Sequence, residues 1–243
     1  MISPRAARTI ASIHKWLGLI VAAQLLVWTV SGLFFASFAM TQIHGDHLVH
    51  PPEHADPIDL SRVKVSMADA LKAVAEDRPA EVILKQLAGD PVYEIRAEIG
   101  VFLVSAETGA VVSPLDEEFA GRIAVARWAG EGLLETMELI EQAPRESALN
   151  GEVWAAHFEG AGNPTLYVST ATGRVSEART DLWRTYDFLW SLHIMDWGPA
   201  RENFNTPWLV AFAVLALSTV LFGIALLVHR FTRGVLREKR EEA

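Results

Sequence analysis

Two long apolar segments without charged residues lie towards opposite ends of the chain. They are Trp16–Met40 and Trp208–Val228. At a helical rise of about 1.5 Å per residue, each segment is long enough to cross the ~30 Å hydrocarbon core of a bilayer. We therefore predict transmembrane helices over residues 16–40 and 206–228. A secretory signal peptide is the alternative for the first segment, although the apolar part of such a peptide is usually only about 7–15 residues long.

The residues between the two apolar segments have the patterns of a small α+β domain. After a polar linker over 41–60, the apolar residues of 66–76 recur at helical spacing behind Ser66, which is placed to cap the helix. Three short runs rich in β-forming residues follow, and a Glu-Thr-Gly turn closes the unit. The strands are expected over 82–87, 92–97 and 101–105, and the turn at 107–109.

A weaker copy of this unit follows later in the chain. We predict a helix over 133–140, strands over 151–159 and 165–169, and a turn at 171–174. The two copies share a hairpin that leads into a Thr-Gly turn, FLVSAETGAVV in the first and LYVSTATGRVS in the second. An internal duplication is therefore predicted within a domain over 61–180, with repeats of about 61–115 and 130–180. Two unrelated hairpins are the alternative.

The stretch over 181–205, before the second apolar segment, is aromatic and amphipathic. Its first part, DLWRTYDFLWSLHIMDW, places aromatic and apolar residues at helical spacing on one face. Such a helix suits the headgroup level of a bilayer. An interfacial anchor without chemistry explains the aromatic residues, but it does not explain His193.

The charge and the cysteine content of the chain exclude several kinds of site and of partner. The chain has a net charge of −9 and no cysteine, which excludes disulfides, thiolate metal sites, Fe–S clusters and covalent haem attachment. The acidic balance argues against nucleic acid as a partner. Basic residues lie outside the apolar segments, in tails over 1–15 and 229–243, while the middle is acidic. By the positive-inside rule, we expect a bacterial inner-membrane protein with both termini cytoplasmic and the central domain periplasmic.

Histidines stand at the boundaries of both apolar segments. His14 precedes the first and His229 follows the second, so antiparallel helices would bring them to a similar depth. Two imidazoles on neighbouring helices can hold a haem iron from opposite sides. The alternative is that both are ordinary interfacial residues.

A second group of histidines follows the first apolar segment. The tract IHGDHLVHPPEH contains His44, His47, His50 and His54, a composition that suits Zn²⁺ or Cu²⁺. His47 is also placed to meet His193 at the outer membrane surface, which would give a second haem site above the first. A solvated linker is the alternative.

Three stretches of the chain together resemble PepSY-associated transmembrane proteins. They are IHKWLGLIVAAQLLVWTVSGLFF, the hairpin around YEI and TGAVV, and WRTYDFLWSLHIMDW. Larger relatives of that family include inner-membrane ferric-siderophore reductases with b-type haem. The resemblance implies a PepSY-like periplasmic domain and electron transfer through one or two haem b groups to a periplasmic acceptor, such as a ferric siderophore or another metal. It also implies that His14 and His193 match the family's motif histidines.

The chain departs from those larger relatives because it has two predicted spans where they have four or more. A homodimer or another membrane subunit is therefore expected to complete the haem-binding bundle. No nucleotide-binding fingerprint is present, so a cytoplasmic flavoprotein or a quinol would have to supply the electrons. A different class of function stays open beside this one: a non-enzymatic, membrane-anchored PepSY interaction module that binds a labile metal through its histidine tract.

Overall fold

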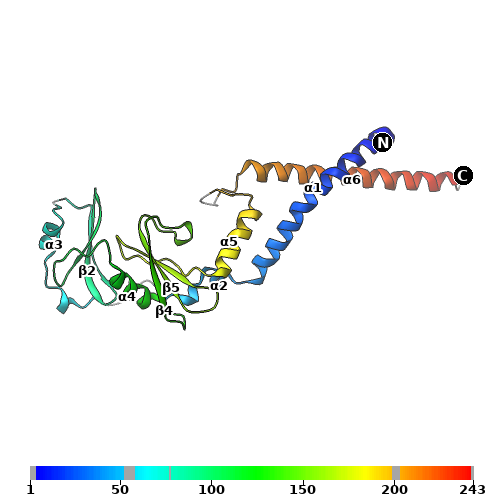
Figure 1. The fold of residues 1–243 in the computed structure, drawn as a ribbon. Helices are drawn as coiled ribbons and strands as arrows, with labels where there is room; N and C mark the ends of the chain where they lie inside the picture. Colours follow the sequence, from blue (N-terminus) through cyan, green and yellow to red (C-terminus); the bar gives the residue numbers. More distant parts are fainter. Residues whose placement is uncertain (1–3, 52–57, 77, 199–202, 242–243) are drawn as a thin grey trace. The chain divides into compact units, whose positions relative to one another are not determined.

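The computed structural model describes residues 4–51, 58–76, 78–198 and 203–241, and it is an α+β structure with two long apolar helices (Figure 1). It divides into two compact units, one over 38–185 and the other formed by the described parts of 1–37 and 186–243.

The first half of the unit over 38–185 is a short helix followed by a three-stranded antiparallel sheet. Ser66 accepts a hydrogen bond from the backbone of Asp69 at the start of the helix, as its position predicts. One face of the sheet packs against this helix around the buried side chains of Tyr93, Ile95 and Val104. The elements are α3 (Met67–Ala73), β1 (Glu81–Leu87), β2 (Asp90–Ala97) and β3 (Gly100–Ser105), in the sheet order β1-β2-β3.

The second half repeats the plan of a helix and a three-stranded meander, but not with the predicted boundaries. Its elements are α4 (Glu117–Arg127), β4 (Leu134–Ile140), β5 (Val153–Phe158) and β6 (Thr165–Ser169), in the sheet order β4-β5-β6. The predicted helix over 133–140 is therefore wrong, because that segment is the edge strand β4.

A β-bulge explains why the pattern of this strand is misleading. Leu134 pairs with Phe158 and Thr136 with His157, which leaves Glu135 as an extra residue. The extra residue brings Leu134 and Met137 to the same side of the strand, a spacing of three that is otherwise typical of a helix. The helix of this repeat is instead α4, which begins behind Asp116, whose carboxylate accepts a hydrogen bond from the backbone of Phe119.

The two Thr-Gly turns have the same hydrogen bonds, which supports the predicted duplication. The amide of Gly109 donates to the carbonyl of Ser105, and that of Gly173 donates to Ser169, at 2.9 and 2.8 Å. Beyond each turn the chain returns to pair with the strand that it left, through bridges between Val104 and Val111 and between Val168 and Val175.

The main core of this unit lies between the two sheets and α4. It contains residues from both repeats, among them Leu87, Leu103, Ile123, Phe158 and Leu166. A buried ion pair adds a polar link: Lys85 in β1 binds Glu94 in β2 and also donates to the carbonyl of Thr172 in the second turn, at 2.8 Å.

The remaining helices are α1 (Pro4–Ser37), α2 (Met40–His44), α5 (Asp181–His193) and α6 (Pro207–Glu241), with short 3₁₀ turns η1 (Asp46–Leu48), η2 (Leu60–Arg62) and η3 (Arg145–Ser147). Two helical stretches, Arg5–Ser37 and Pro207–Thr232, are long and apolar enough to cross a membrane. The α1 helix extends beyond the predicted segment to Pro4 and ends three residues before Met40.

The long helices α1 and α6 pack against each other and leave apolar side chains on their outer surfaces. Leu19, Leu26 and Leu33, spaced by seven residues along α1, are 64%, 65% and 69% exposed. A continuous apolar stripe of this kind requires an apolar environment, which supports a membrane location for the pair.

The two turns provide a matched test of packing inside the duplicated unit. Both Gly109 and Gly173 have positive φ, at +79° and +66°, so alanine is strained at either position. A Cβ at Gly109 would make an ordinary contact of 3.6 Å with Val65, whereas at Gly173 it would lie 2.7 Å from Leu87. We expect G109A to cost about 1 kcal/mol and G173A about 1 kcal/mol more, measured by urea-dependent hydrogen exchange of the full-length protein. Equal costs would contradict the packing of the second turn.

The ion pair of Glu94 predicts a pH dependence of the first sheet. Burial acts to raise the pKa of Glu94, but hydrogen bonds from Lys85 and Arg96 outweigh it and hold this pKa below the ordinary value of 4.5. A depressed carboxyl pKa stabilises the fold above the unfolded pKa, and the stabilisation is lost as the pH falls through the folded pKa. We expect E94Q to cost about 2 kcal/mol at pH 7 and to flatten the acid-side loss of hydrogen-exchange protection over β1 to β3. An unaltered acid profile in E94Q would contradict this assignment.

Candidate functional site

An aromatic pocket surrounds His193 in the unit that contains the long helices. It has a volume of about 390 Å³ and is lined by residues of α1, α5, α6 and the segment between α5 and α6: Trp28, Trp190, His193, Ile194, Phe204 and Leu209. This volume lies within the range of small-molecule and cofactor sites. Among these described lining residues, His193 is the one titratable side chain.

Two hydrogen bonds fix His193 to α1. The Nδ1 atom of its imidazole lies 2.7 Å from the hydroxyl of the fully buried Ser31, and the indole of Trp28 donates to its carbonyl oxygen at 2.8 Å. The first bond holds the ring and the second holds the carboxyl end of α5. The imidazole is therefore oriented by groups on another helix as well as by its own rotamer.

The partner of Ser31 determines which ring nitrogen carries the proton. The hydroxyl of Ser31 donates its own hydrogen to the carbonyl of Val27, at 2.7 Å. A hydroxyl has a single hydrogen, so when Ser31 donates it to Val27 its oxygen accepts from Nδ1 of His193, and this arrangement requires the tautomer with the proton on Nδ1. The neutral ring then has its lone pair on Nε2, the nitrogen that can bind a metal.

The surroundings favour the neutral form of this imidazole. Phe35 lies at 5.4 Å and Trp190 stacks in parallel at 6.3 Å, both measured between ring centroids. Burial lowers the pKa of His193 because the charged form loses hydration. A neutral imidazole with a fixed ring and a free Nε2 is the state in which histidine binds metals.

Two further predicted residues, His14 and His229, lie where α1 and α6 pack. The ring of His14 covers Gly223, since a Cβ added at that glycine would lie 3.1 Å from the His14 Cε1 atom. His229 follows six residues later, about 9 Å further along the axis of α6. His14 Nδ1 and His229 Nε2 are each buried without a hydrogen-bond partner. Their predicted pairing across a single haem stays a prediction.

The histidine tract is divided in the structure. His44 lies near Asp46 and Glu177, whereas His47 and His50 are exposed side chains outside that group. His54 lies outside the described residues. His47 and His193 belong to different units, so their pairing also stays a prediction.

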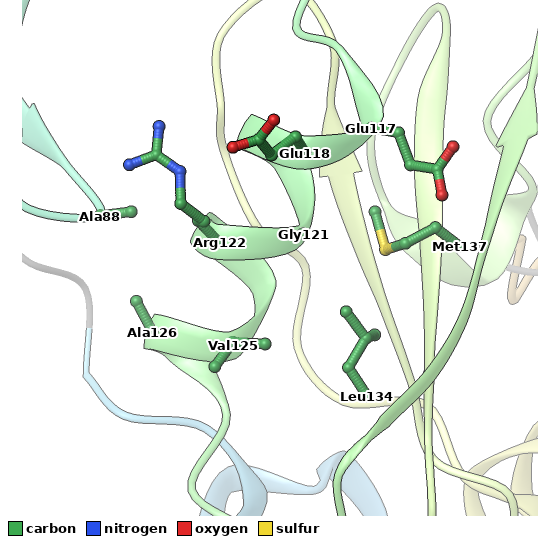
Figure 2. Close-up of a pocket in the computed structure, with 9 residues that line it drawn as sticks. All are labelled: Ala88, Glu117, Glu118, Gly121, Arg122, Val125, Ala126, Leu134 and Met137. Carbon is green, nitrogen blue, oxygen red and sulfur yellow. The ribbon is translucent and has the colours of Figure 1, made fainter.

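A larger and shallower pocket lies between α4 and β4, with a volume of about 800 Å³ (Figure 2). Leu134 and Met137 of β4 and Val125 of α4 form its apolar part, and Glu118 and Arg122 stand at its rim. Glu117 also lines the pocket, and its described lining residues include no histidine.

Comparisons with family models, curated proteins and solved structures find no match to this chain. The residues themselves therefore carry the functional argument. Sequence reasoning identified His193 but missed Ser31 and Trp28. Trp28 and Ser31 are three residues apart, and Ser31 and Phe35 are four apart, so all three lie on one face of α1. This spacing is visible in the sequence and could have indicated them.

The hydrogen bond to Ser31 predicts a single tautomer of His193. In haem-free protein carrying ¹⁵N-labelled histidine, we expect Nδ1 protonated and Nε2 unprotonated at neutral pH, with H193Q used to assign the signals. In S31A the bond is lost, so we expect a mixture of tautomers. The control is S37A, because that hydroxyl also lies on α1 and binds only a carbonyl of its own helix. Protonated Nε2 in the unmodified chain would contradict the assignment.

Proposed function

We propose that the chain is a membrane-anchored b-type haem protein that serves as an electron-transfer subunit, in which His193 would hold the haem through its imidazole. The observation that carries the proposal is the hydrogen bond between His193 and the buried Ser31 inside an aromatic pocket. A histidine that binds a metal usually donates its other ring N–H to a neighbouring group, and the Ser31 hydroxyl lies within reach of Nδ1 for that role.

The residues present fit a haem in three respects. The pocket around His193 is lined by aromatic and aliphatic side chains, which suit the faces of a macrocycle. Burial lowers the pKa of the imidazole and so favours its neutral form. His14 in α1 and His229 in α6 each have a buried ring nitrogen without a hydrogen-bond partner. Burial of such an atom costs free energy of folding unless a ligand binds it.

The geometry also supports a partner chain for the unit that contains the long helices, here called the membrane unit. Haem iron with two axial imidazoles needs a second histidine, and among the described lining residues of this pocket His193 is the one imidazole. A second copy of the chain or another membrane subunit would supply it. A bundle of helices from two chains would also cover the exposed leucines of α1.

When bound, haem supplies a one-electron carrier. The chain's own residues would hold it, exclude water with aromatic walls and present a neutral nitrogen, and these properties set the potential of the iron. In this proposal a cytoplasmic flavoprotein or a quinol donates the electrons, and the PepSY-like unit faces the periplasm, where a ferric siderophore or another metal complex accepts them. The protein would lie in the inner membrane of a bacterium with both termini in the cytoplasm.

The non-enzymatic alternative has one observation in its favour. The pocket between α4 and β4 combines an apolar floor with charged rim residues, as a docking surface does. In that case the helices would serve as an anchor, and the three histidines of the membrane unit would have no ligand.

The test is the visible spectrum of the detergent-solubilised protein made with ample haem. We expect a sharp b-type α-band in the dithionite-reduced minus oxidised spectrum. H193A should remove the band of the haem that this residue holds, because the iron loses an axial nitrogen. H157A is the matched control, since that imidazole lies on β5 outside the membrane unit.

Two results would count against the proposal. A featureless spectrum in the unmodified chain would favour the anchored interaction module. A spectrum and haem content unchanged in H193A would remove His193 from the ligand set, and H14A and H229A would then test the other two histidines.

A further inference from the structure

A second ligand cluster lies within the unit over 38–185. His44, Asp46 and Glu177 each offer one ligand atom, and these three atoms lie within 4.8 Å of one another. The first two residues flank Gly45, between α2 and η1, and the third lies beyond β6. Residues far apart in the sequence thus present one imidazole and two carboxylates to one point.

The backbone that carries these ligands is tightly packed. Gly45 has φ +74°, and a Cβ at this position would lie 2.7 Å from the carbonyl oxygen of Ala178. The neighbours Ile43 and Ala178 are completely buried. Since Gly45 and Ala178 touch, the residues beside them, His44, Asp46 and Glu177, are held together whether or not an ion is present.

A buried arginine orients one of the three ligands. The side chain of Arg179 is only 7% exposed, and its Nη1 atom lies 3.0 Å from Oε2 of Glu177. Its guanidinium also donates to the carbonyl of Glu146 and lies over the ring of Trp183 at 4.6 Å. Arg179 is thus fixed by several groups and in turn restrains the carboxylate of Glu177.

The donor set indicates the class of ion. One imidazole nitrogen and two carboxylate oxygens suit a first-row divalent transition metal, whereas Mg²⁺ and Ca²⁺ prefer oxygen ligands alone. Three protein ligands leave coordination positions open to water, as in exchangeable or catalytic zinc sites. Asp46 and Glu177 are exposed, so an ion could enter and leave without opening the fold.

We propose that His44, Asp46 and Glu177 form an exchangeable site for a divalent transition-metal ion such as Zn²⁺. The site differs from the one predicted from the sequence, because two carboxylates take the place of His47 and His50 beside His44. It does not depend on the proposed haem function, since none of its ligands belongs to the membrane unit.

The experiment uses the full-length detergent-solubilised protein without an affinity tag that contains histidine. Co²⁺ is added as the spectroscopic probe, and Zn²⁺ is added to displace it. We expect visible d–d bands that saturate at one Co²⁺ per chain and disappear when Zn²⁺ is added. H44A should abolish the bands, and D46N and E177Q should each weaken binding about tenfold or more.

Two control variants are matched to the ligands. H47A removes an exposed histidine of the same segment, and E141Q removes an exposed carboxylate of the same unit. We expect both to bind Co²⁺ as the unmodified chain does. Because Asp46 and Glu177 are exposed, D46N and E177Q retain the fold, and hydrogen exchange over β1 to β6 verifies this.

Two results would overturn the proposal. Unchanged Co²⁺ affinity in D46N and E177Q would show that the carboxylates are not ligands. A loss in H47A equal to that in H44A would assign the ion to the exposed histidine tract instead. Haem content is measured on the same samples, so a failure of the metal site is distinguished from a failure of the haem proposal.

Discussion

The unit that contains the long helices is governed by the cost of leaving a polar atom without a partner in an apolar environment. The hydroxyl groups along α1 and α6 avoid this cost by donating to carbonyl oxygens one turn back in the same helix, as Thr29, Ser31 and Thr219 do. An imidazole cannot use this solution, because the second ring nitrogen points away from the helix. His193 finds a partner for one nitrogen in Ser31, whereas His14 and His229 each retain a buried atom without one. Gln24 of α1 likewise has a buried side-chain nitrogen without a partner. Among the described residues of this unit, His14, Gln24 and His229 are thus places where the helices do not supply a hydrogen-bond partner.

The unit over 38–185 is subject to a different constraint: its two small halves must share one hydrophobic core. A three-stranded sheet with one short helix buries little apolar surface alone. Here the second Thr-Gly turn fits into the first repeat, since Gly173 leaves room for Leu87 and Lys85 binds the carbonyl of Thr172. The equivalent glycine of the first turn, Gly109, contacts only Val65. The two turns are therefore alike in their hydrogen bonds and different in their packing.

Most of the regular structure could be predicted from the sequence because local patterns determine it. The strands β1, β2, β3, β5 and β6 and both turns follow from β-forming runs that end in Gly. The first apolar segment lies in α1 up to Ser37, and the second lies within α6. The failure at β4 arose because a bulge produces a spacing of three, which is indistinguishable from a helix in the sequence alone. The omission of α4 was avoidable, since Asp116 followed by two glutamates is a helix start.

The candidate sites were less predictable because they depend on contacts between distant segments. His193 could be singled out by its unusual position, but its tautomer depends on the hydroxyl of Ser31 and on where that hydroxyl donates. His44 could be singled out as a ligand, but its neighbour Glu177 lies near the opposite end of the unit over 38–185 in the sequence. The contact between Gly45 and Ala178 brings them together, and nothing local to either segment predicts that contact.

The charges around the two histidine sites favour two kinds of metal. A bare divalent cation in the pocket of His193 would be buried without compensation, since the described lining residues include no carboxylate. An iron whose charge is balanced by its own porphyrin avoids that cost, so the apolar pocket favours haem over a free ion. At His44 the situation is reversed: Asp46 and Glu177 provide negative charge and access to water, which favour a small hydrated ion. In the two proposals the same side chain is therefore given different metal chemistry, according to the charge and hydration of its neighbours.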